Sequence, residues 1–270
     1  MRQILTILAL VLLLTPATAR AQAFQPNEAG VTNGHWHLNT RDLDAHRKIL
    51  VAMGGTAVKA GDFELVQFPG VTVYLHGRQR TAPTGGTVGS VVDHVGFIVP
   101  NVAEAVARWK AAGVAVLPGL NGRTDQAYVV TPDELRIEIL EDKAQTFPIR
   151  SHHVHLYGSA SIKEIQAWYA DVFGARIGMR GRFQSVDVPG INISLSESEK
   201  PLPSTRGRVL DHIGFDVVDL QAFLKKIEGK GVKLDRPFEP RPGGGLAFIY
   251  DPWGTYIELN QRPDPQYIAN

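Results

Sequence analysis

The chain has 270 residues, with 28 lysines and arginines against 27 aspartates and glutamates, and no cysteine. A formal net charge of +1 without a long basic block gives no electrostatic footprint for nucleic acid or an anionic membrane surface. Without cysteine the fold has no disulfide, no thiolate metal ligand and no cysteine nucleophile, so any metal must be held by histidine and carboxylate.

Residues 1–23 have the pattern of a secretory signal peptide. A basic start precedes an apolar run over 4–14, Pro16 breaks that run, and alanines at 21 and 23 have cleavage spacing. The run is well short of the roughly 20 residues of a membrane span, and no later segment comes close. We therefore expect a secreted or periplasmic protein, off the membrane after cleavage near Phe24; a retained N-terminal anchor is the alternative.

A repeat follows the leader four times. Each copy has a histidine heading a short apolar or alternating run, then a polar break and a helical pattern; the copies read HWHLNTRDLDAHRKI from His35, HVGFIVPNVAEAVARW from His94, HVHLYGSASIKEIQAWY from His153 and HIGFDVVDLQAFLKKI from His212. His35 and His94 lie 59 residues apart, as do His153 and His212, and the two pairs are 118 residues apart. This regularity indicates internal duplication.

Each copy predicts one strand, one helix and three further strands. Asp42 is a typical helix start, and a glycine ends each helical pattern, at 54, 113, 174 and 231. Strand-like runs follow at 63–68, 127–131, 182–188 and 246–251, and turn-led closing strands at 68–75, 131–139, 188–195 and 251–259. The closing strands carry Glu138 and Glu258 in the even copies and Tyr74 and Ser194 at the same position in the odd copies.

These repeats, with histidine heading the first strand and glutamate on the fourth after a DPWG turn, resemble the vicinal oxygen chelate superfamily of glyoxalases, bleomycin resistance proteins and extradiol dioxygenases. The resemblance covers about residues 31 to 260. It implies an α+β fold in which four βαβββ modules pair into two cupped mixed β-sheets, with a metal bound inside by first and fourth strands. We expect one domain over 31–145 from modules 1 and 2, and another over 151–262 from modules 3 and 4.

The resemblance also implies the metal ligands. With neighbouring modules paired, one set is His35, His94 and Glu138, with Tyr74 in the fourth position, and the other is His153, His212 and Glu258, with Ser194 fourth. Some four-module relatives pair modules one with four and two with three, which would instead join His35 to His212 and Glu258. The residue types are the same either way.

Two imidazoles and one carboxylate leave positions open for substrate, as in the facial triads of non-haem Fe(II) oxygenases. We expect a divalent metal, Fe(II) first, with Zn, Mn or Ni as alternatives, and a small-molecule substrate with adjacent oxygens. His37 and His155 lie on the same strand face as His35 and His153, because side chains on a strand repeat every two residues, and they are candidate acid–base groups.

The match to extradiol dioxygenases is incomplete. Tyr128 stands ten residues before Glu138, where those enzymes have a tyrosine, so it is a third catalytic candidate; Phe248 occupies the corresponding position before Glu258. Neither copy has the histidine that those enzymes place further upstream.

Three functions are consistent with the sequence. The first is an exported, metal-dependent enzyme with an extradiol-dioxygenase-like site; the second is a glyoxalase-like lyase or isomerase without redox chemistry; the third is a non-catalytic binding protein of the resistance type. Tyr74 and Ser194 disfavour glyoxalase chemistry, which uses a second carboxylate in that position. We expect a monomer or homodimer, since one chain supplies complete ligand sets.

Overall fold

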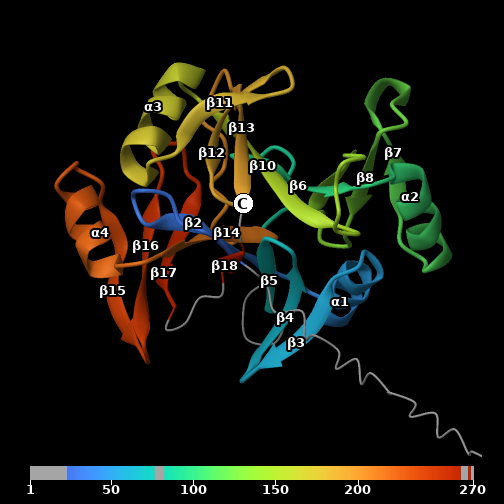
Figure 1. Cartoon of the computed structure of the whole chain (residues 1–270), viewed down its shortest axis with the longest axis horizontal. Helices are drawn as coiled ribbons and strands as arrows, with labels where there is room; N and C mark the ends of the chain where they lie inside the picture. Colours follow the sequence, from blue (N-terminus) through green and yellow to red (C-terminus); the bar gives the residue numbers. More distant parts are fainter. Residues whose placement is uncertain (1–22, 77–81, 263–266, 269–270) are drawn as a thin grey trace, which may run out of the picture.

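A computed structural model describes residues 23–76, 82–262 and 267–268 (Figure 1). The predicted leader lies outside these ranges except for Ala23. None of the described helices is long and apolar enough to cross a membrane. A short parallel pair, β1 (Ala23–Phe24) with β18 (Tyr267–Ile268), joins the two ends of the described chain.

The four repeats fold as four βαβββ modules, so the predicted element order is confirmed. Module 1 has β2 (Val31–Asn39), α1 (Leu43–Ala52), β3 (Thr56–Ala60), β4 (Phe63–Phe68) and β5 (Val71–His76). Module 2 has β6 (Val92–Val99), α2 (Val102–Ala111), β7 (Val116–Pro118), the 3-10 turn η1 (Leu120–Gly122), β8 (Gln126–Val130) and β9 (Arg136–Glu141). Module 3 has β10 (Arg150–Gly158), α3 (Ile162–Phe173), β11 (Arg176–Arg180), β12 (Phe183–Val188) and β13 (Ile191–Glu197). Module 4 has β14 (Leu210–Val217), α4 (Leu220–Glu228), β15 (Leu234–Arg241), β16 (Gly244–Tyr250) and β17 (Tyr256–Gln261).

The helix boundaries follow the capping residues. Asp42 caps α1 by accepting a hydrogen bond from the backbone N–H of Ala45. The predicted stop glycines follow each helix with positive φ, and Gly174, at φ 65°, is the left-handed C-cap of α3. A residue without a Cβ takes this conformation at little cost, which is why glycine ends the helical pattern in all four copies.

The strands form two mixed eight-stranded sheets, which confirms the predicted fold class. One sheet has the order β11-β12-β13-β10-β6-β9-β8-β7 and joins modules 3 and 2; the other, β15-β16-β17-β14-β2-β5-β4-β3, joins modules 4 and 1. The predicted pairing of modules 1 and 2 over 31–145, and of 3 and 4 over 151–262, is therefore wrong, and the alternative pairing is observed. Local sequence could not decide this, because all four first strands are similar and the pairing depends on which of them meet.

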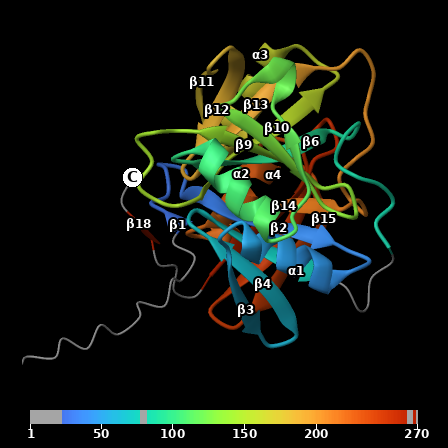
Figure 2. The ribbon, with the colours of Figure 1, turned by 90° about the vertical axis from the view of Figure 1, so that its right-hand side faces the viewer.

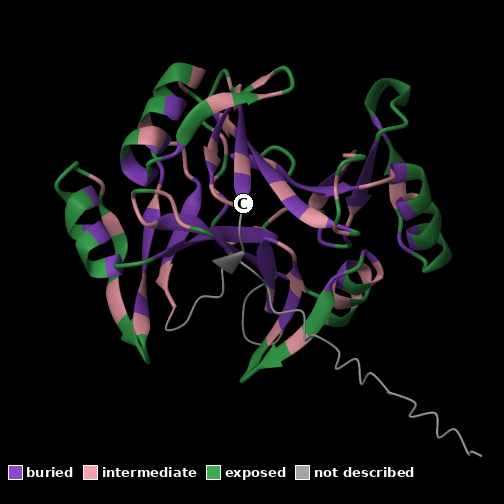
Figure 3. Cartoon of the chain, viewed as in Figure 1, coloured by how far each residue is buried: buried purple, intermediate pink, exposed green. Residues whose placement is uncertain are grey.

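The first strands of paired modules lie antiparallel at the centre of each sheet, β2 against β14 and β10 against β6. Within each module the fourth strand runs parallel to the first and beside it. These central strands are the most buried part of the molecule, and exposed residues gather on the outer helix faces and hairpin tips (Figure 3).

One apolar core runs through both sheets and the helices. Trp36 of β2 contacts Phe97 of β6 with ring centroids 5.4 Å apart, and Phe68 of β4 contacts the same ring at 4.7 Å. Since Trp36 alternates with His35 and His37 along β2, its contact with the other sheet leaves the histidines on the opposite face. The sheets thus pack through one face each, with the helices around them (Figure 2), and their other faces carry the histidines.

Candidate metal centres

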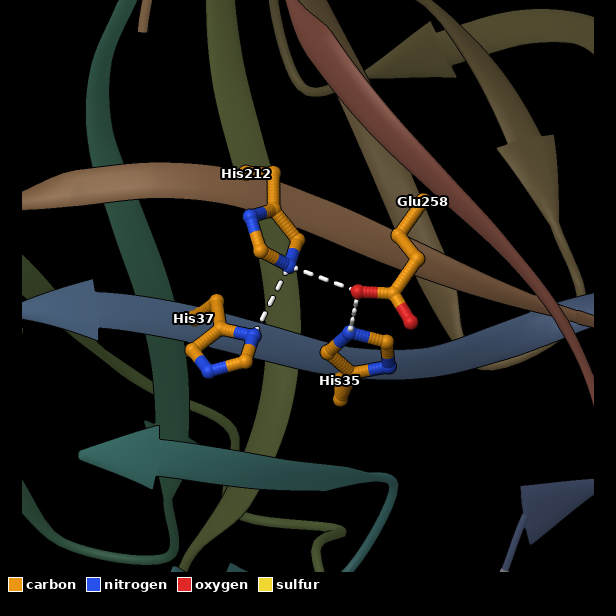
Figure 4. A group of neighbouring side chains, drawn as sticks. All are labelled: His35, His37, His212 and Glu258. Atoms are coloured by element: carbon orange, nitrogen blue, oxygen red, sulfur yellow. Dashed lines mark hydrogen bonds and ion pairs between the residues drawn. The ribbon is translucent and has the colours of Figure 1, made fainter. Parts of the chain in front are cut away.

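Each sheet gathers buried histidines and one glutamate from its two modules. On the sheet of modules 1 and 4, ligand atoms of His35, His37, His212 and Glu258 lie within 4.8 Å of one another (Figure 4). On the sheet of modules 2 and 3, those of His94, Glu138 and His153 do so. We call the first cluster the outer-pair site, because it joins the first and last modules, and the second the inner-pair site.

The predicted ligands therefore meet in a different grouping from the one we expected first. His35 lies with His212 and Glu258, not with His94 and Glu138, because β2 pairs with β14. Each site still has two histidines from central strands and one glutamate from a fourth strand. All ligand candidates of both sites come from a single chain.

A glycine between two strands makes room for the inner-pair site. Gly96 of β6 pairs with Glu138 of β9 on one side and with His153 of β10 on the other. A Cβ on Gly96 would lie 2.0 Å from Cε1 of His153. The missing side chain thus lets a glutamate and a histidine from flanking strands lean over the central strand and meet.

The outer-pair site has the same arrangement of a glycine between a glutamate and a histidine on the flanking strands. Gly214 of β14 pairs with Glu258 of β17 and with His35 of β2, and a Cβ on it would lie 2.0 Å from Cε1 of His35. The remaining ligand of each site, His212 or His94, precedes its glycine by two residues and shares its face. The His-x-Gly pattern of the even repeats is therefore a space requirement of the histidine on the neighbouring strand.

The ligand atoms have the spacing of a metal site. Oε2 of Glu138 lies 2.9 Å from Nε2 of His153 and 3.4 Å from Nε2 of His94. Oε2 of Glu258 lies 2.8 Å from Nε2 of His212 and 3.4 Å from Nε2 of His35. Two ligands each about 2.1 Å from one metal, at angles between octahedral and tetrahedral, lie about 3.0–3.4 Å apart.

The three inner-pair ligand atoms are also buried without a hydrogen-bond partner, namely Nε2 of His94, Nε2 of His153 and Oε2 of Glu138. Buried polar atoms are normally satisfied, so three that converge on one point need an explanation. A cation there would satisfy all three at once. The donor set of nitrogen and carboxylate oxygen fits a divalent transition metal.

An aspartate directly before each even-module histidine fixes its tautomer. Nδ1 of His94 lies 2.7 Å from Oδ1 of Asp93, and Nδ1 of His212 lies 2.6 Å from Oδ1 of Asp211. Since an ionised carboxylate only accepts, each Nδ1 carries the proton and donates it, which leaves the lone pair on Nε2 toward the cluster. Carboxylate–histidine pairs of this kind orient metal ligands.

Both glutamates are held at their second oxygen. Tyr128 donates its hydroxyl to Oε1 of Glu138 at 3.0 Å, and Gln126 donates Nε2 to the same oxygen. In the outer-pair site Asn260 donates to Oε1 of Glu258 at 2.9 Å. Burial alone would raise the pKa of Glu138, but the neighbouring imidazoles of His153 and His94 outweigh it and hold that pKa well below its usual range. Each carboxylate is thus ionised, and its Oε2 atom points toward the ligand histidines.

Aromatic rings surround the outer-pair site. The ring of His37 stacks on His76 with centroids 4.1 Å apart, and Nδ1 of His37 lies 2.8 Å from Nε2 of His212. Tyr74, in the fourth family position, has its ring 5.1 Å from that of His35. No oxygen of a second carboxylate belongs to this cluster among the described residues.

Polar and cationic groups surround the inner-pair site. Arg180 of β11 donates Nε to Oγ of Ser194 at 2.5 Å, and its Nη1 lies 3.9 Å from Oε2 of Glu138. The Arg180 side chain is only 15% exposed, and burial lowers the pKa of its guanidinium. His155 bonds through Nε2 to Oγ of Ser196 at 2.9 Å, and burial lowers its pKa to about 4.

The three predicted catalytic residues all lie at the sites but differ in their contacts. Tyr128 is hydrogen-bonded to the Glu138 carboxylate, so it positions that ligand. His155 lies beside His94 with ring centroids 4.9 Å apart and is held by Ser196. His37 points its Nδ1 into the ligand cluster itself. Their catalytic roles remain predictions.

Sequence reasoning missed several supporting residues. Asp93 and Asp211 had a readable signal, since both even repeats begin with an Asp-His pair in VDHVGF and LDHIGF. Arg180 had none, because its entry into the site depends on the hairpin of β11 and β12. From the strand period, His152 is expected to be a structural residue that faces away from His153; in the structure Nδ1 of His152 lies 2.9 Å from Nδ1 of His153.

Comparison with known proteins agrees with the fold. Residues 150–259 match the profile of the Glyoxalase/Bleomycin resistance protein/Dioxygenase superfamily. Glyoxalase I from Zea mays is similar with a TM-score of 0.69 at 15% identity, over 86% of this chain and 92% of that one. A candidate dioxygenase from Bacillus subtilis is similar with a TM-score of 0.61 at 16% identity, over 93% of each chain. No curated protein matches this sequence. At 15–16% sequence identity, the similarity to these solved structures shows the fold alone.

Proposed function

We propose that the protein is a metal-dependent enzyme whose catalytic centre is the inner-pair site. In support, residues 150–259 match the profile of the Glyoxalase/Bleomycin resistance protein/Dioxygenase superfamily, and the chain has a fold similar to that of glyoxalase I. The observation that supports this most directly is the convergence of two imidazole nitrogens and one carboxylate oxygen, all buried and without hydrogen-bond partners. Three protein ligands leave coordination positions for a substrate.

The charges around the two sites favour the inner pair for an anionic substrate. With neutral histidines, the inner-pair site has two carboxylates and two arginines (Asp93, Glu138, Arg136 and Arg180). The outer-pair site has three carboxylates and one arginine (Asp211, Asp216, Glu258 and Arg262). A divalent cation would therefore leave a net charge of +2 at the first and zero at the second. A buried positive site attracts a negatively charged ligand.

The substrate class we propose is a small molecule with two adjacent oxygens, at least one of them ionised, such as a catechol. A divalent metal held by His94, His153 and Glu138 would supply a Lewis acid and a template for the two oxygens. Arg180 would donate to the ionised oxygen, since its guanidinium already faces the cluster. His155 is the neighbouring group that can take up a proton released by the substrate, while Tyr128 holds the ligand carboxylate in place.

The ligand set favours extradiol-type ring opening, with Fe(II) as first choice. In this reaction the ring carbon–carbon bond beside the diol breaks and both atoms of one O₂ enter the product, so no other reductant is needed. The test is anaerobic purification with metal counted per chain, followed by oxygen uptake with catechol and substituted catechols. We expect iron and one O₂ consumed per catechol.

Glu138→Gln keeps the side-chain volume but removes the charge, so it should lose the inner-pair metal and all oxygen uptake. Glu239→Gln, at a partly exposed carboxylate of β15 that pairs with Arg236 outside both clusters, is the matched control and should keep both. Metal content unchanged in Glu138→Gln would contradict the ligand assignment. No metal after reloading would instead leave a binding protein of the resistance type.

A second candidate is a lyase or isomerase that uses Zn, Mn or Ni. The observation that favours it is His155, an uncharged imidazole beside the open face of the triad, which could move a proton between neighbouring carbons without oxygen. Zinc, manganese or nickel in the purified protein, with no oxygen uptake, would select this alternative.

We further propose that the protein is exported, on the strength of the leader pattern alone. N-terminal sequencing of protein recovered from the periplasm or medium tests this. A mature chain starting near Phe24 is expected, and an intact Met1 in the soluble cell fraction would contradict it.

A further inference from the structure

The two sites differ in the number of side chains that reach the cluster. At the outer-pair site a third histidine, His37, places Nδ1 2.8 Å from Nε2 of His212 (Figure 4). Nε2 of His212 is in turn 2.8 Å from Oε2 of Glu258, which is 3.4 Å from Nε2 of His35. All three separations fall near the spacing of ligands that share one metal.

The tautomer of His212 makes its contact with His37 informative. Because Asp211 takes the proton of Nδ1, Nε2 of His212 has only its lone pair to offer. If His212 gave this lone pair to a metal, Nδ1 of His37 would lose its hydrogen-bond acceptor. Nδ1 of His37, 2.8 Å from Nε2 of His212, would then be placed to bind the same metal through its own lone pair. The other ring nitrogen of His37, Nε2, is buried without a hydrogen-bond partner. No hydrogen bond of Nε2 therefore holds the His37 ring away from the cluster.

The equivalent histidine at the inner-pair site does not enter the cluster. His155 pairs with His94 across the sheet as His37 pairs with His212, yet its Nε2 is bound to Oγ of Ser196. The residue of β5 that corresponds to Ser196 is His76, which stacks flat against His37. One flanking residue therefore holds His155 back by a hydrogen bond, whereas its counterpart packs His37 against the ligands.

We propose that the outer-pair site is a four-ligand metal centre, with Nδ1 of His37 beside His35, His212 and Glu258, whereas the inner-pair site has three ligands. This rests on the proposed metal binding and assigns the two sites different tasks. A site with four protein ligands retains its metal, whereas a site with three leaves a coordination position of the metal open for substrate. The outer-pair metal is then a resident ion that stabilises the fold, and substrate binds only at the inner pair.

The experiment isolates each site in the full-length protein. Glu138→Gln leaves the outer-pair site alone, and Glu258→Gln leaves the inner-pair site alone. In these backgrounds we compare His37→Phe with its matched control His155→Phe, and measure Co(II) affinity by chelator competition together with the visible Co(II) spectrum. His37→Phe should weaken Co(II) binding by more than about 100-fold, since even loss of an outer partner of a ligand costs about 10–100-fold.

His155→Phe should weaken Co(II) binding by less than about 10-fold and leave the spectrum in place, because its ring is outside the ligand set. His37→Gly with added imidazole separates ligation from packing. Free imidazole should restore the Co(II) spectrum of the outer-pair site, which a merely structural His37 would not allow. Catechol should change the spectrum of the inner-pair site and leave that of the outer-pair site unchanged.

Equal, small effects of His37→Phe and His155→Phe would overturn the fourth ligand, as would catechol-dependent changes at both sites. This failure is distinguishable from failure of the proposed function. If Co(II) binds only at the inner pair, the four-ligand centre is wrong and the enzyme proposal is unaffected. If neither site binds Co(II), the proposed metal dependence itself is wrong.

Discussion

The two candidate sites share one frame of two histidines and a glutamate and differ in the side chains that approach it. Each has a glutamate and a histidine leaning over a glycine, and a second histidine oriented by the aspartate before it. The surroundings differ at equivalent strand positions. Ala60 stands where the inner pair has Arg180, and His76 where it has Ser196. Duplication has therefore preserved the positions that set ligand geometry, while the neighbours that set charge and access have diverged.

Even the support of the glutamate has been exchanged between strands. At the inner pair the amide is Gln126 on β8, opposite Leu140 of β9; at the outer pair it is Asn260 on β17, opposite Leu246 of β16. Either amide donates to Oε1 of its glutamate. The hydrogen bond is thus the shared requirement, and the strand that supplies it is interchangeable.

The largest effect should come from filling the glycine gap. Gly96→Ala and Gly214→Ala each place a methyl group 2.0 Å from a buried histidine ring, so that ring must shift. Each should lose the metal of its own site, keep the other, and be destabilised by about 1–3 kcal/mol through overpacking. Metal counts and urea unfolding measure both. Gly178→Ala on β11, where the nearest atom is 3.4 Å away, is the control; metal retained in both site variants would contradict the shared frame.

The aspartates should give the next largest effect. Asp93→Asn and Asp211→Asn replace the acceptor of the ligand histidine with a neutral amide, so we expect metal affinity to fall about 10–100-fold at the affected site. Asp211→Asn should also lower the free energy of unfolding, because Oδ2 of Asp211 accepts from Gly207 N and Asn39 Nδ2 as well. Chelator competition measures the loss of metal affinity, and urea unfolding measures the loss of stability. Equal stability of both variants would show that the loop bonds are weak.

The sequence predicted the modules because they follow local rules, and the family resemblance supplied the candidate ligands. Repeated histidines at a fixed spacing, glycine helix stops and turn-led closing strands are visible without tertiary contacts. Pairing of the modules was not predictable in this way, since Gly96 and Gly214 accept a histidine from any similar first strand. The pairing of modules brings His35 to His212, and this contact can be seen only from the register of β2 against β14.

Arg180 contributes one of the two charges by which the sites differ, and its removal tests that contribution. Arg180→Ala gives the inner pair the residue that the outer pair has at position 60. A charge-assisted hydrogen bond contributes about 1.5–3 kcal/mol, so binding of an ionised catechol should weaken about 10- to 150-fold, with metal affinity raised or unchanged. Isothermal titration with 4-nitrocatechol measures this. Unchanged affinity for the anion would remove Arg180 from the substrate site.

The smallest effect concerns a contact between the two sheets, at α1. His46 is fully buried; its Nδ1 lies 2.8 Å from Oγ1 of Thr40, and its Nε2 lies 3.8 Å from Oδ2 of Asp133 in the β8–β9 turn of module 2. Burial lowers the pKa of His46 in the folded protein, despite the opposing effect of Asp42 and Asp133. The unfolded chain then binds more protons between that lowered pKa and the ordinary value of about 6.5. The contribution of His46 to stability is therefore complete above about pH 6.5 and is lost as the pH falls.

The corresponding link between modules 3 and 4 joins Tyr169 to Asp251 by a 2.8 Å hydrogen bond and has no histidine. Acid should therefore weaken the α1 link selectively. His46→Gln keeps a polar side chain without the titration, so the difference in unfolding free energy between wild type and variant should shrink from pH 8 to pH 5. A difference independent of pH would show that the pKa of His46 is the same in the folded and unfolded protein. Protection of α1 amides from hydrogen exchange should fall before that of α3, which places the acid-sensitive contact on the outer-pair side of the molecule.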